Sequence, residues 1–327
     1  MNKLKTLFII LGIAIVVSVY LNAVLDVSIR VFDPDELEHL HAARALNRDS
    51  IIYKDFFEHH MPLLYLLLKP LHLYLQDTIS YLFSGRWLMV GFSVITCLLI
   101  FLICRIAYSS ASAYLSTFIF ISHFLFRHKA MEIRPDNVMI PAFLLAVLLL
   151  IRGEKYKSKF LFFLSGLFMS LAFLTSIKAS YGIIGCFAAI WLNRKRYEHS
   201  KTIWNRIFFV GFGSAIPFLV TLGYLFKYSM VQEFFYYTLF INLKWQYNFQ
   251  PWRSLSIVSM NDPALTTLLV IAWIFFLYRA AKKNFDNALS NYPLIIGSVI
   301  LLFVLFLTPN PYLQNLSYPL PFLSMFA

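Results

Sequence analysis

Long apolar runs alternate with short polar segments along almost the whole chain. These runs span residues 7–25, 81–104, 111–127, 137–151, 160–176, 179–192, 206–227, 264–279 and 291–308, and another begins near 317. They are continuous, whereas a half-buried strand would alternate apolar and polar positions, so the pattern favours helices. A helix of about 20 apolar residues crosses the hydrocarbon core of a bilayer. We therefore predict an all-α integral membrane protein with about nine or ten transmembrane helices.

The composition excludes a soluble protein. Of the 327 residues, 60% are hydrophobic and only 13% are charged, whereas soluble domains carry about 25% charged residues. The three cysteines all lie inside apolar runs, which is typical of small core residues and argues against a disulfide framework or a zinc site.

The net charge of +12 does not indicate nucleic-acid binding, because the basic residues cluster in short loops between the apolar runs. This is the bias that the positive-inside rule produces. It places the N-terminus in the cytoplasm. Residues 26–80, 128–136, the turn near Lys178, 228–263 and 309–316 then lie on the opposite, extracytoplasmic face.

We expect residues 1–327 to form a single transmembrane domain whose catalytic loop is 26–80. The last apolar segment stops at Ala327, about ten residues after it begins, which is too short to cross a bilayer. We therefore expect either that the chain is truncated at its C-terminus or that it ends in a half-span.

Ionisable residues are concentrated in the first extracytoplasmic loop. Nine of the sixteen acidic residues lie there: Asp26, Asp33, Asp35, Glu36, Glu38, Asp49, Asp55, Glu58 and Asp77. Five of the eight histidines also lie there: His39, His41, His59, His60 and His72. Carboxylates and imidazoles gathered beside a membrane indicate a site for proton transfer, a metal ion or a phosphate.

The first half of this loop predicts a short helix from Pro34 to about Leu46. Asp33 suits the N-cap, Pro34 suits the first helical position, and Glu36 stands where a capping box needs its glutamate. An apolar stripe on this helix would let it lie on the membrane surface; it comprises Leu37, Leu40 and Ala43.

The second half predicts another membrane-surface helix beginning after Pro62. Glu58, His59 and His60 precede it, and this combination is a plausible set of ligands for a divalent metal ion. Because three consecutive residues rarely converge on one ion, we expect at most two of them to bind.

The stretches Pro34–His39 and Phe56–Leu63 resemble the first extracytoplasmic loop of the GT-C glycosyltransferases. The most similar branch comprises bacterial members related to protein O-mannosyltransferases and aminoarabinose transferases. Arg134-Pro135-Asp136, Lys178 after a Leu-Thr segment, and Pro311-Tyr312 are further shared features. Relatives commonly have more spans and often a C-terminal soluble domain, so this chain departs from their pattern by ending early.

The resemblance implies a membrane glycosyltransferase of the cytoplasmic (inner) membrane. Such enzymes transfer a sugar from a polyprenyl-phosphate carrier to an acceptor hydroxyl and invert the anomeric centre. The absence of a Gly-rich phosphate loop from the sequence agrees with a lipid-linked donor and with no nucleotide or organic cofactor. The acceptor could be a lipid, a glycan or a protein.

The resemblance also assigns roles within the predicted site. It implies Asp35 as the catalytic base with Glu36 as neighbour or second choice, Glu58 as a metal-binding acid assisted by His59 or His60, and Arg134 and Lys178 as ligands of the donor phosphate.

Two other classes remain open on the sequence alone. A multi-pass transporter would place ionisable residues within its spans at mid-membrane depth, whereas here most lie in loops. A non-catalytic relative, or another membrane protein that processes lipid-linked polysaccharide, is the second alternative. In the latter we would expect the key arginines and histidines in later loops.

Overall fold

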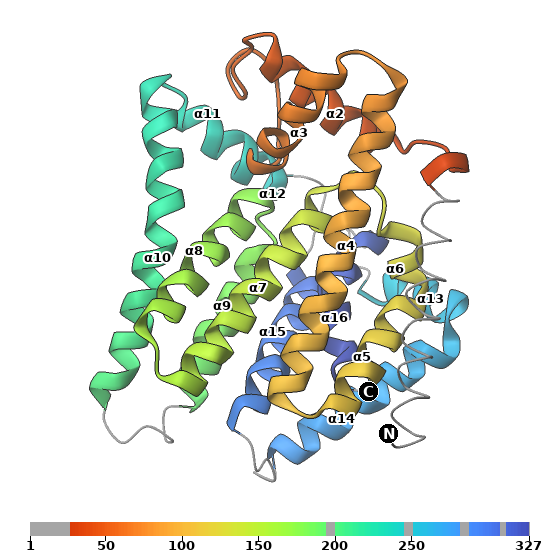
Figure 1. The fold of residues 1–327 in the computed structure, drawn as a ribbon, viewed down its shortest axis with the longest axis vertical. Helices are drawn as coiled ribbons and strands as arrows, with labels where there is room; N and C mark the ends of the chain where they lie inside the picture. Colours follow the sequence, from red (N-terminus) through yellow and green to blue (C-terminus); the bar gives the residue numbers. More distant parts are fainter. Residues whose placement is uncertain (1–26, 194–199, 245–250, 282–287, 308–311, 327) are drawn as a thin grey trace, which may run out of the picture.

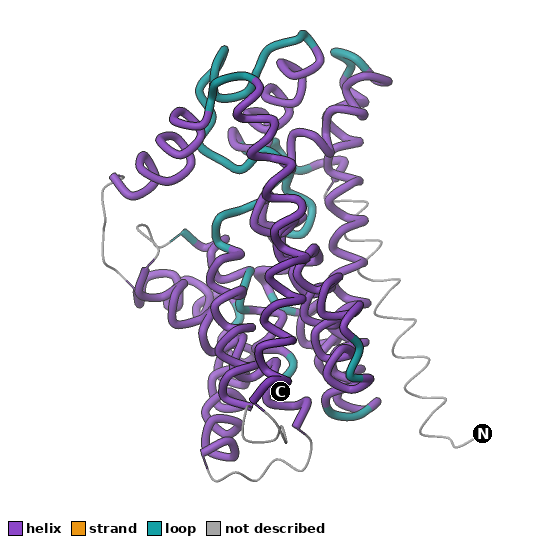
Figure 2. The backbone as a smooth tube through the Cα atoms, turned by 90° about the vertical axis from the view of Figure 1, so that its left-hand side faces the viewer, coloured by secondary structure: helices purple, strands orange, loops and turns teal. Residues whose placement is uncertain are grey.

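The computed structural model describes residues 27–193, 200–244, 251–281, 288–307 and 312–326. The predicted first span, residues 7–25, lies outside the described residues. Within the described part the chain is helical, with one isolated bridge between Ile52 and Phe56 and no strand (Figure 2). This confirms the predicted all-α class.

The helices follow the apolar runs closely. In chain order they are α2 (Pro34–Asn47), α3 (Leu63–Leu75), α4 (Ile79–Ala107), α5 (Ser110–Ser122), α6 (Phe124–Lys129), α7 (Pro135–Tyr156), α8 (Lys159–Thr175), α9 (Ala179–Leu192), α10 (Ser200–Lys227), α11 (Val231–Phe235), a π-helix (Tyr236–Ile241), α12 (Asn242–Lys244), α13 (Pro251–Asn261), α14 (Pro263–Ala281), α15 (Asn291–Leu307), and α16 (Leu320–Ser324). Short 3-10 turns at Ala288–Ser290 and Leu313–Ser317 complete them.

Among the described residues, three helical segments are both long and apolar enough to cross a membrane. They are Ile79–Ala107, Pro135–Tyr156 and Ile203–Lys227. Six shorter apolar segments accompany them, spanning Leu63–Leu75, Ser110–Ser122, Lys159–Thr175, Ala179–Leu192, Thr266–Phe275 and Asn291–Leu307. The long helices run roughly side by side, and α2 and α3 cover one end of the bundle (Figure 1).

Two predicted spans differ from the structure. The run 111–127 is broken into α5 and α6 at His123, whose extended backbone lets its Nδ1 accept a hydrogen bond from the amide of Leu125. The segment near 317 does not begin a long helix. It forms a 3-10 turn and then α16, and it packs Tyr318 and Phe322 against Phe143 in the core.

Helices α8 and α10 contact each other directly through their backbones. A Cβ atom on Gly166 would lie 1.9 Å from the carbonyl oxygen of Val210, and one on Gly213 would lie 1.9 Å from that of Phe163. The Ser214 hydroxyl donates a hydrogen bond of 2.9 Å to the Gly166 carbonyl oxygen. Small residues allow such backbone contact between helices in a membrane, where lipid is as apolar as leucine.

Helices α2 and α3 pack on each other and on α4. Leu40 and Ala43 of the predicted surface stripe are buried in a core shared with Leu64 and Leu68 of α3, while Leu37 is 46% exposed. Two of the three stripe residues therefore pack against protein, and of the three only Leu37 is exposed on the outside of the bundle.

Candidate active site

Asp35 is placed by the capping box at the start of α2. The Asp33 carboxylate accepts a hydrogen bond of 3.0 Å from the Asp35 amide, and the Glu36 carboxylate accepts one of 2.9 Å from the Asp33 amide. Both bonds of the predicted capping box are present, and Pro34 occupies the first turn. The local sequence thus fixes the first turn of α2.

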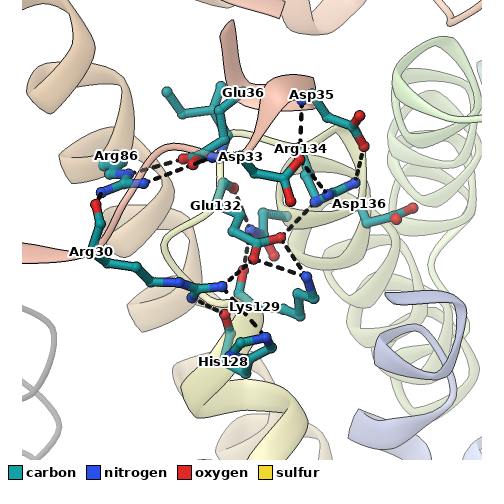
Figure 3. Close-up of polar contacts among 12 residues, drawn as sticks. Arg30, Asp33, Asp35, Glu36, Arg86, His128, Lys129, Glu132, Arg134 and Asp136 are labelled. Atoms are coloured by element: carbon teal, nitrogen blue, oxygen red, sulfur yellow. Dashed lines mark hydrogen bonds and ion pairs between the residues drawn. The ribbon is translucent and has the colours of Figure 1, made fainter. Parts of the chain in front are cut away.

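This turn presents the carboxylate of Asp35, the predicted catalytic base, at the surface. Its side chain is 48% exposed, and Oδ2 lies 2.7 Å from Nη1 of Arg134 (Figure 3). Arg134 is the N-cap of α7, and its guanidinium contacts two further carboxylates: Nη2 lies 3.3 Å from Asp33 and Nε lies 2.6 Å from Glu132.

 Burial alone would lower the pKa of the Arg134 guanidinium. The negative charges of Glu132, Asp35 and Asp33 have the larger effect and raise this pKa above its usual value. Arg134 therefore stays charged and orients the Asp35 carboxylate.

Glu36 is the neighbour of Asp35 but lies in a different environment. Its side chain is fully buried and forms a two-pronged ion pair with Arg86 of α4, at 3.0 Å from Nε and 2.8 Å from Nη2. It also accepts a hydrogen bond of 3.2 Å from the Ile133 amide. Glu36 thus joins the start of α2 to α4 and to the segment before α7.

Arg86 also holds the chain that leads into α2. Its Nη1 donates to the carbonyl oxygen of Arg30 at 2.7 Å, and its Nη2 donates to that of Val31 at 3.0 Å. Its guanidinium carbon lies 3.7 Å from the centroid of the Phe32 ring. The sequence reasoning did not single out Arg86. The sequence feature that could have indicated its role is its place inside the apolar run 81–104, because an arginine in such a run is rare unless it is paired.

Three basic side chains converge on Glu132, just before α7. Arg30 Nη2 lies 2.6 Å from Glu132 Oε1, Lys129 Nζ lies 2.9 Å from each carboxylate oxygen, and Arg134 Nε lies 2.6 Å from Oε2 (Figure 3). Glu132 is 1% exposed. The sequence reasoning missed Arg30, Lys129 and Glu132, although basic residues on the predicted outer face run against the positive-inside bias and mark the cluster.

Lys178 lies at the start of α9 and forms an ion pair with Asp136, with Nζ 2.8 Å from Oδ2. Asp136 is in the first turn of α7, two residues after Arg134. The structure therefore brings the two predicted phosphate ligands to neighbouring positions, each already paired with a carboxylate.

Glu58, His59 and His60 gather beside the exposed face of α2. Their ligand atoms and those of Glu38 all lie within 4.8 Å of one another. The chain brings ligand atoms of all three consecutive residues into range of one another, and the expectation that at most two of them bind one ion stays a prediction. Glu38, one turn after Asp35 on α2, is the fourth member that sequence spacing did not indicate.

The loop that carries this cluster is held by its backbone. The Tyr53 hydroxyl donates to the carbonyl oxygen of His60 at 2.7 Å, and Asn242 Nδ2 donates to that of His59 at 3.0 Å. Asn242 follows the π-helix Tyr236–Ile241, a rare conformation that is often found near functional sites. The residues 231–244 and the first loop therefore meet at the cluster.

The electrostatics of the cluster suit a cation. Burial, together with His60, lowers the pKa of His59 to about 4, so its imidazole is neutral at pH 7. Burial and the neighbouring Glu58 raise the pKa of Glu38. Burial alone would raise the pKa of Glu58, but the hydrogen bonds and charge of His60 lower it. A neutral imidazole and an ionised carboxylate are the forms that bind a metal ion.

Comparison with known proteins identifies the family. The profile of the family described as dolichyl-phosphate-mannose-protein mannosyltransferase matches residues 61–224, half of the chain. The chain belongs to this family. The match confirms the resemblance to GT-C glycosyltransferases that the first loop predicts. No curated protein matches the chain in sequence.

Solved structures show the same fold in another member of this superfamily. ArnT from Cupriavidus metallidurans in the apo state matches with a TM-score of 0.73 at 13% identity, over 98% of this chain and 59% of that one. The same protein bound to undecaprenyl phosphate matches with a TM-score of 0.71 at 12% identity, over 100% and 59%. At such identity the likeness shows the fold alone, and the family member described here spans 59% of the length of ArnT.

Proposed function

We propose that this mannosyltransferase-family chain transfers a sugar from a polyprenyl-phosphate donor to an acceptor hydroxyl. The observation that carries the proposal is the pairing of Asp35 with Arg134, which presents a half-exposed carboxylate beside a cluster of cations. The family match and the ArnT-like fold support the class of reaction. The donor is proposed because one of the similar structures is bound to undecaprenyl phosphate.

In this mechanism Asp35 acts as the general base. It takes the proton of the acceptor hydroxyl while the hydroxyl oxygen attacks the anomeric carbon of the sugar. The bond from that carbon to the phosphate oxygen breaks, and the phosphate leaves with the bonding electrons. A single displacement inverts the anomeric centre, and nearby cations stabilise the charge that develops on the phosphate.

Glu36 has a supporting role in the proposal. Its carboxylate is buried and shared between Arg86 and two backbone amides, so it positions the first turn of α2. Asp35 is the carboxylate that an acceptor can reach.

A divalent metal ion is a proposed partner of the site. The set of two imidazoles and two carboxylates fits an ion such as Zn²⁺, which takes nitrogen and oxygen ligands in a tetrahedral arrangement. Glu38, Glu58, His59 and His60 would hold it. Such an ion supplies positive charge that favours an ionised hydroxyl or phosphate oxygen nearby.

We also propose the membrane arrangement. The contacts Asp35–Arg134, Lys178–Asp136 and Asn242–His59 bring together segments that the positive-inside rule assigns to the extracytoplasmic face. The active site would then face the outside of the inner membrane, where lipid-linked sugars reach it from the bilayer.

The test is release of free polyprenyl phosphate by the protein in proteoliposomes, with a panel of undecaprenyl-phosphate hexoses and pentoses and with lipid, glycan and peptide acceptors. We expect release by the native chain and its loss in Asp35→Asn. Asp49→Asn is the matched control, because Asp49 is an exposed carboxylate of the same loop with a positive φ that asparagine tolerates. Equal release by Asp35→Asn and the native chain would remove Asp35 from the mechanism.

A further inference from the structure

The end of the bundle opposite the candidate active site carries a group of basic side chains. Helix α7 has 22 residues, so it is about 33 Å long and separates Arg134 from the α7–α8 turn by about the thickness of the hydrocarbon core of a bilayer. The turn and the start of α10 lie at the end of the bundle away from α2 and α3 (Figure 1). The cations in and beside this turn are Arg152, Lys155, Lys157 and Lys159.

Acidic residues do not balance these cations. Glu154 is the only carboxylate in the stretch 137–197. It is already engaged by Arg206 of α10, whose Nε lies 2.6 Å from its Oε1, and both side chains are 6% exposed. Within the part of the chain that the structure describes, none of the four cations forms an ion pair. The turn therefore keeps a surplus of positive charge.

The helix dipole accounts for only part of this charge. The C-terminal end of a helix carries the equivalent of about half a negative charge, which a single cation satisfies. Lys157 is well placed for that, because it is the C-cap of α7. It has a φ of 51°, in the left-handed region where a glycine would be less strained. The remaining cations have no such local reason to lie here.

Exposed aromatic rings accompany the cations. Tyr156, Phe160 and Trp204 are 64%, 65% and 63% exposed. Trp204 belongs to α10, and the ion pair of Arg206 with Glu154 holds that helix beside the turn. Tyrosine and tryptophan collect at the depth of the lipid headgroups, where the ring and its polar edge both find partners. Cations and exposed rings thus share one surface at headgroup depth.

We propose that the α7–α8 turn binds the headgroup of an anionic phospholipid in the leaflet opposite the active site. The exposed Lys155, Lys157 and Lys159 attract the negative charge of the headgroup. Two of them also lie over aromatic rings, Lys155 over Tyr156 at 5.7 Å and Lys159 over Phe209 at 5.6 Å. By the positive-inside rule this leaflet is the cytoplasmic one. The inference goes beyond the proposed function, because it involves no sugar transfer.

The test is native mass spectrometry of the detergent-solubilised protein, titrated with phosphatidylglycerol, phosphatidylcholine or inorganic phosphate. We expect tighter binding of phosphatidylglycerol than of phosphatidylcholine. Changing Lys155, Lys157 and Lys159 together to glutamine should weaken phosphatidylglycerol binding by about tenfold or more and leave phosphatidylcholine binding unchanged. The triple change to arginine keeps the charge and should retain most of the affinity.

A matched control removes the same charge elsewhere. Glutamine replaces three exposed lysines outside this turn: Lys54, Lys227 and Lys244. Two of these also lie over an aromatic ring, so the control reproduces the loss of such contacts. We expect it to bind phosphatidylglycerol as the native chain does.

Thermal unfolding shows whether each variant is folded. Equal phosphatidylglycerol affinity of the folded glutamine variant and the native chain overturns the proposal, as does an equal loss of affinity in the control. Competition by inorganic phosphate at the affinity of the lipid would indicate a general anion site and would overturn the assignment to a phospholipid. Because the assay contains no sugar donor, its outcome is independent of the proposed transfer reaction.

Discussion

Glu36 and Arg86 form a fully buried ion pair in which both carboxylate oxygens accept hydrogen bonds from the guanidinium. The pair joins α2 to α4, and Arg86 also binds the carbonyl oxygens of the segment that leads into α2. The position of Asp35, the residue immediately before Glu36, therefore depends on a contact buried beneath it.

Removing one partner of this pair should destabilise the fold strongly. Arg86→Met leaves the Glu36 carboxylate buried without its counter-ion, which costs about 3–5 kcal/mol. Thermal unfolding in detergent measures the loss. The double variant Glu36→Gln with Arg86→Met removes the orphaned charge and should recover part of it, and a double variant no more stable than Arg86→Met would contradict this account.

The capping box should matter for activity more than its stability contribution suggests. Asp33→Ala removes the N-cap of α2, which costs about 1 kcal/mol, and frees the first turn that carries Asp35. Ser158→Ala removes the cap of α8, where the Ser158 hydroxyl accepts from the Leu161 amide. We expect similar losses of stability but a lower kcat for sugar transfer only in Asp33→Ala.

The histidine–carboxylate cluster predicts metal content that can be measured without any substrate. Glu58→Gln and His59→Asn should each lower the metal bound to purified protein by about tenfold or more, as determined by mass spectrometry after dialysis against a chelator and reloading with Zn²⁺. Asp55→Asn changes a neighbouring exposed carboxylate and should retain the metal. Equal metal content in all four proteins would argue against this site.

The contact between α8 and α10 should tolerate no side chain at Gly166. Gly166→Ala places a methyl group against the carbonyl oxygen of Val210, which forces the helices apart and costs about 1–3 kcal/mol. Gly211→Ala is the control on the same pair of helices, because a Cβ there meets no atom within 4 Å. It should be neutral or slightly stabilising, since alanine favours the helix.

The sequence by itself determined the helical class, most helix positions and the start of α2. Apolar runs long enough to cross a bilayer leave few alternatives to helices, because every backbone polar group must be paired within the segment. Asp33, Pro34 and Glu36 specify the first turn of α2 through contacts three residues apart. Local patterns therefore sufficed wherever the stabilising contacts are local.

Only the tertiary structure decided which charged groups meet. Glu36 could not be distinguished from a solvated first-turn acid until α4 brought Arg86 beneath it. Likewise Arg30 and Glu38 acquire their places through contacts with residues far away in the chain. Ion pairs depend on distance in space, which spacing along a helix gives only for neighbours one turn apart, so the site as a whole follows from the packing of the bundle.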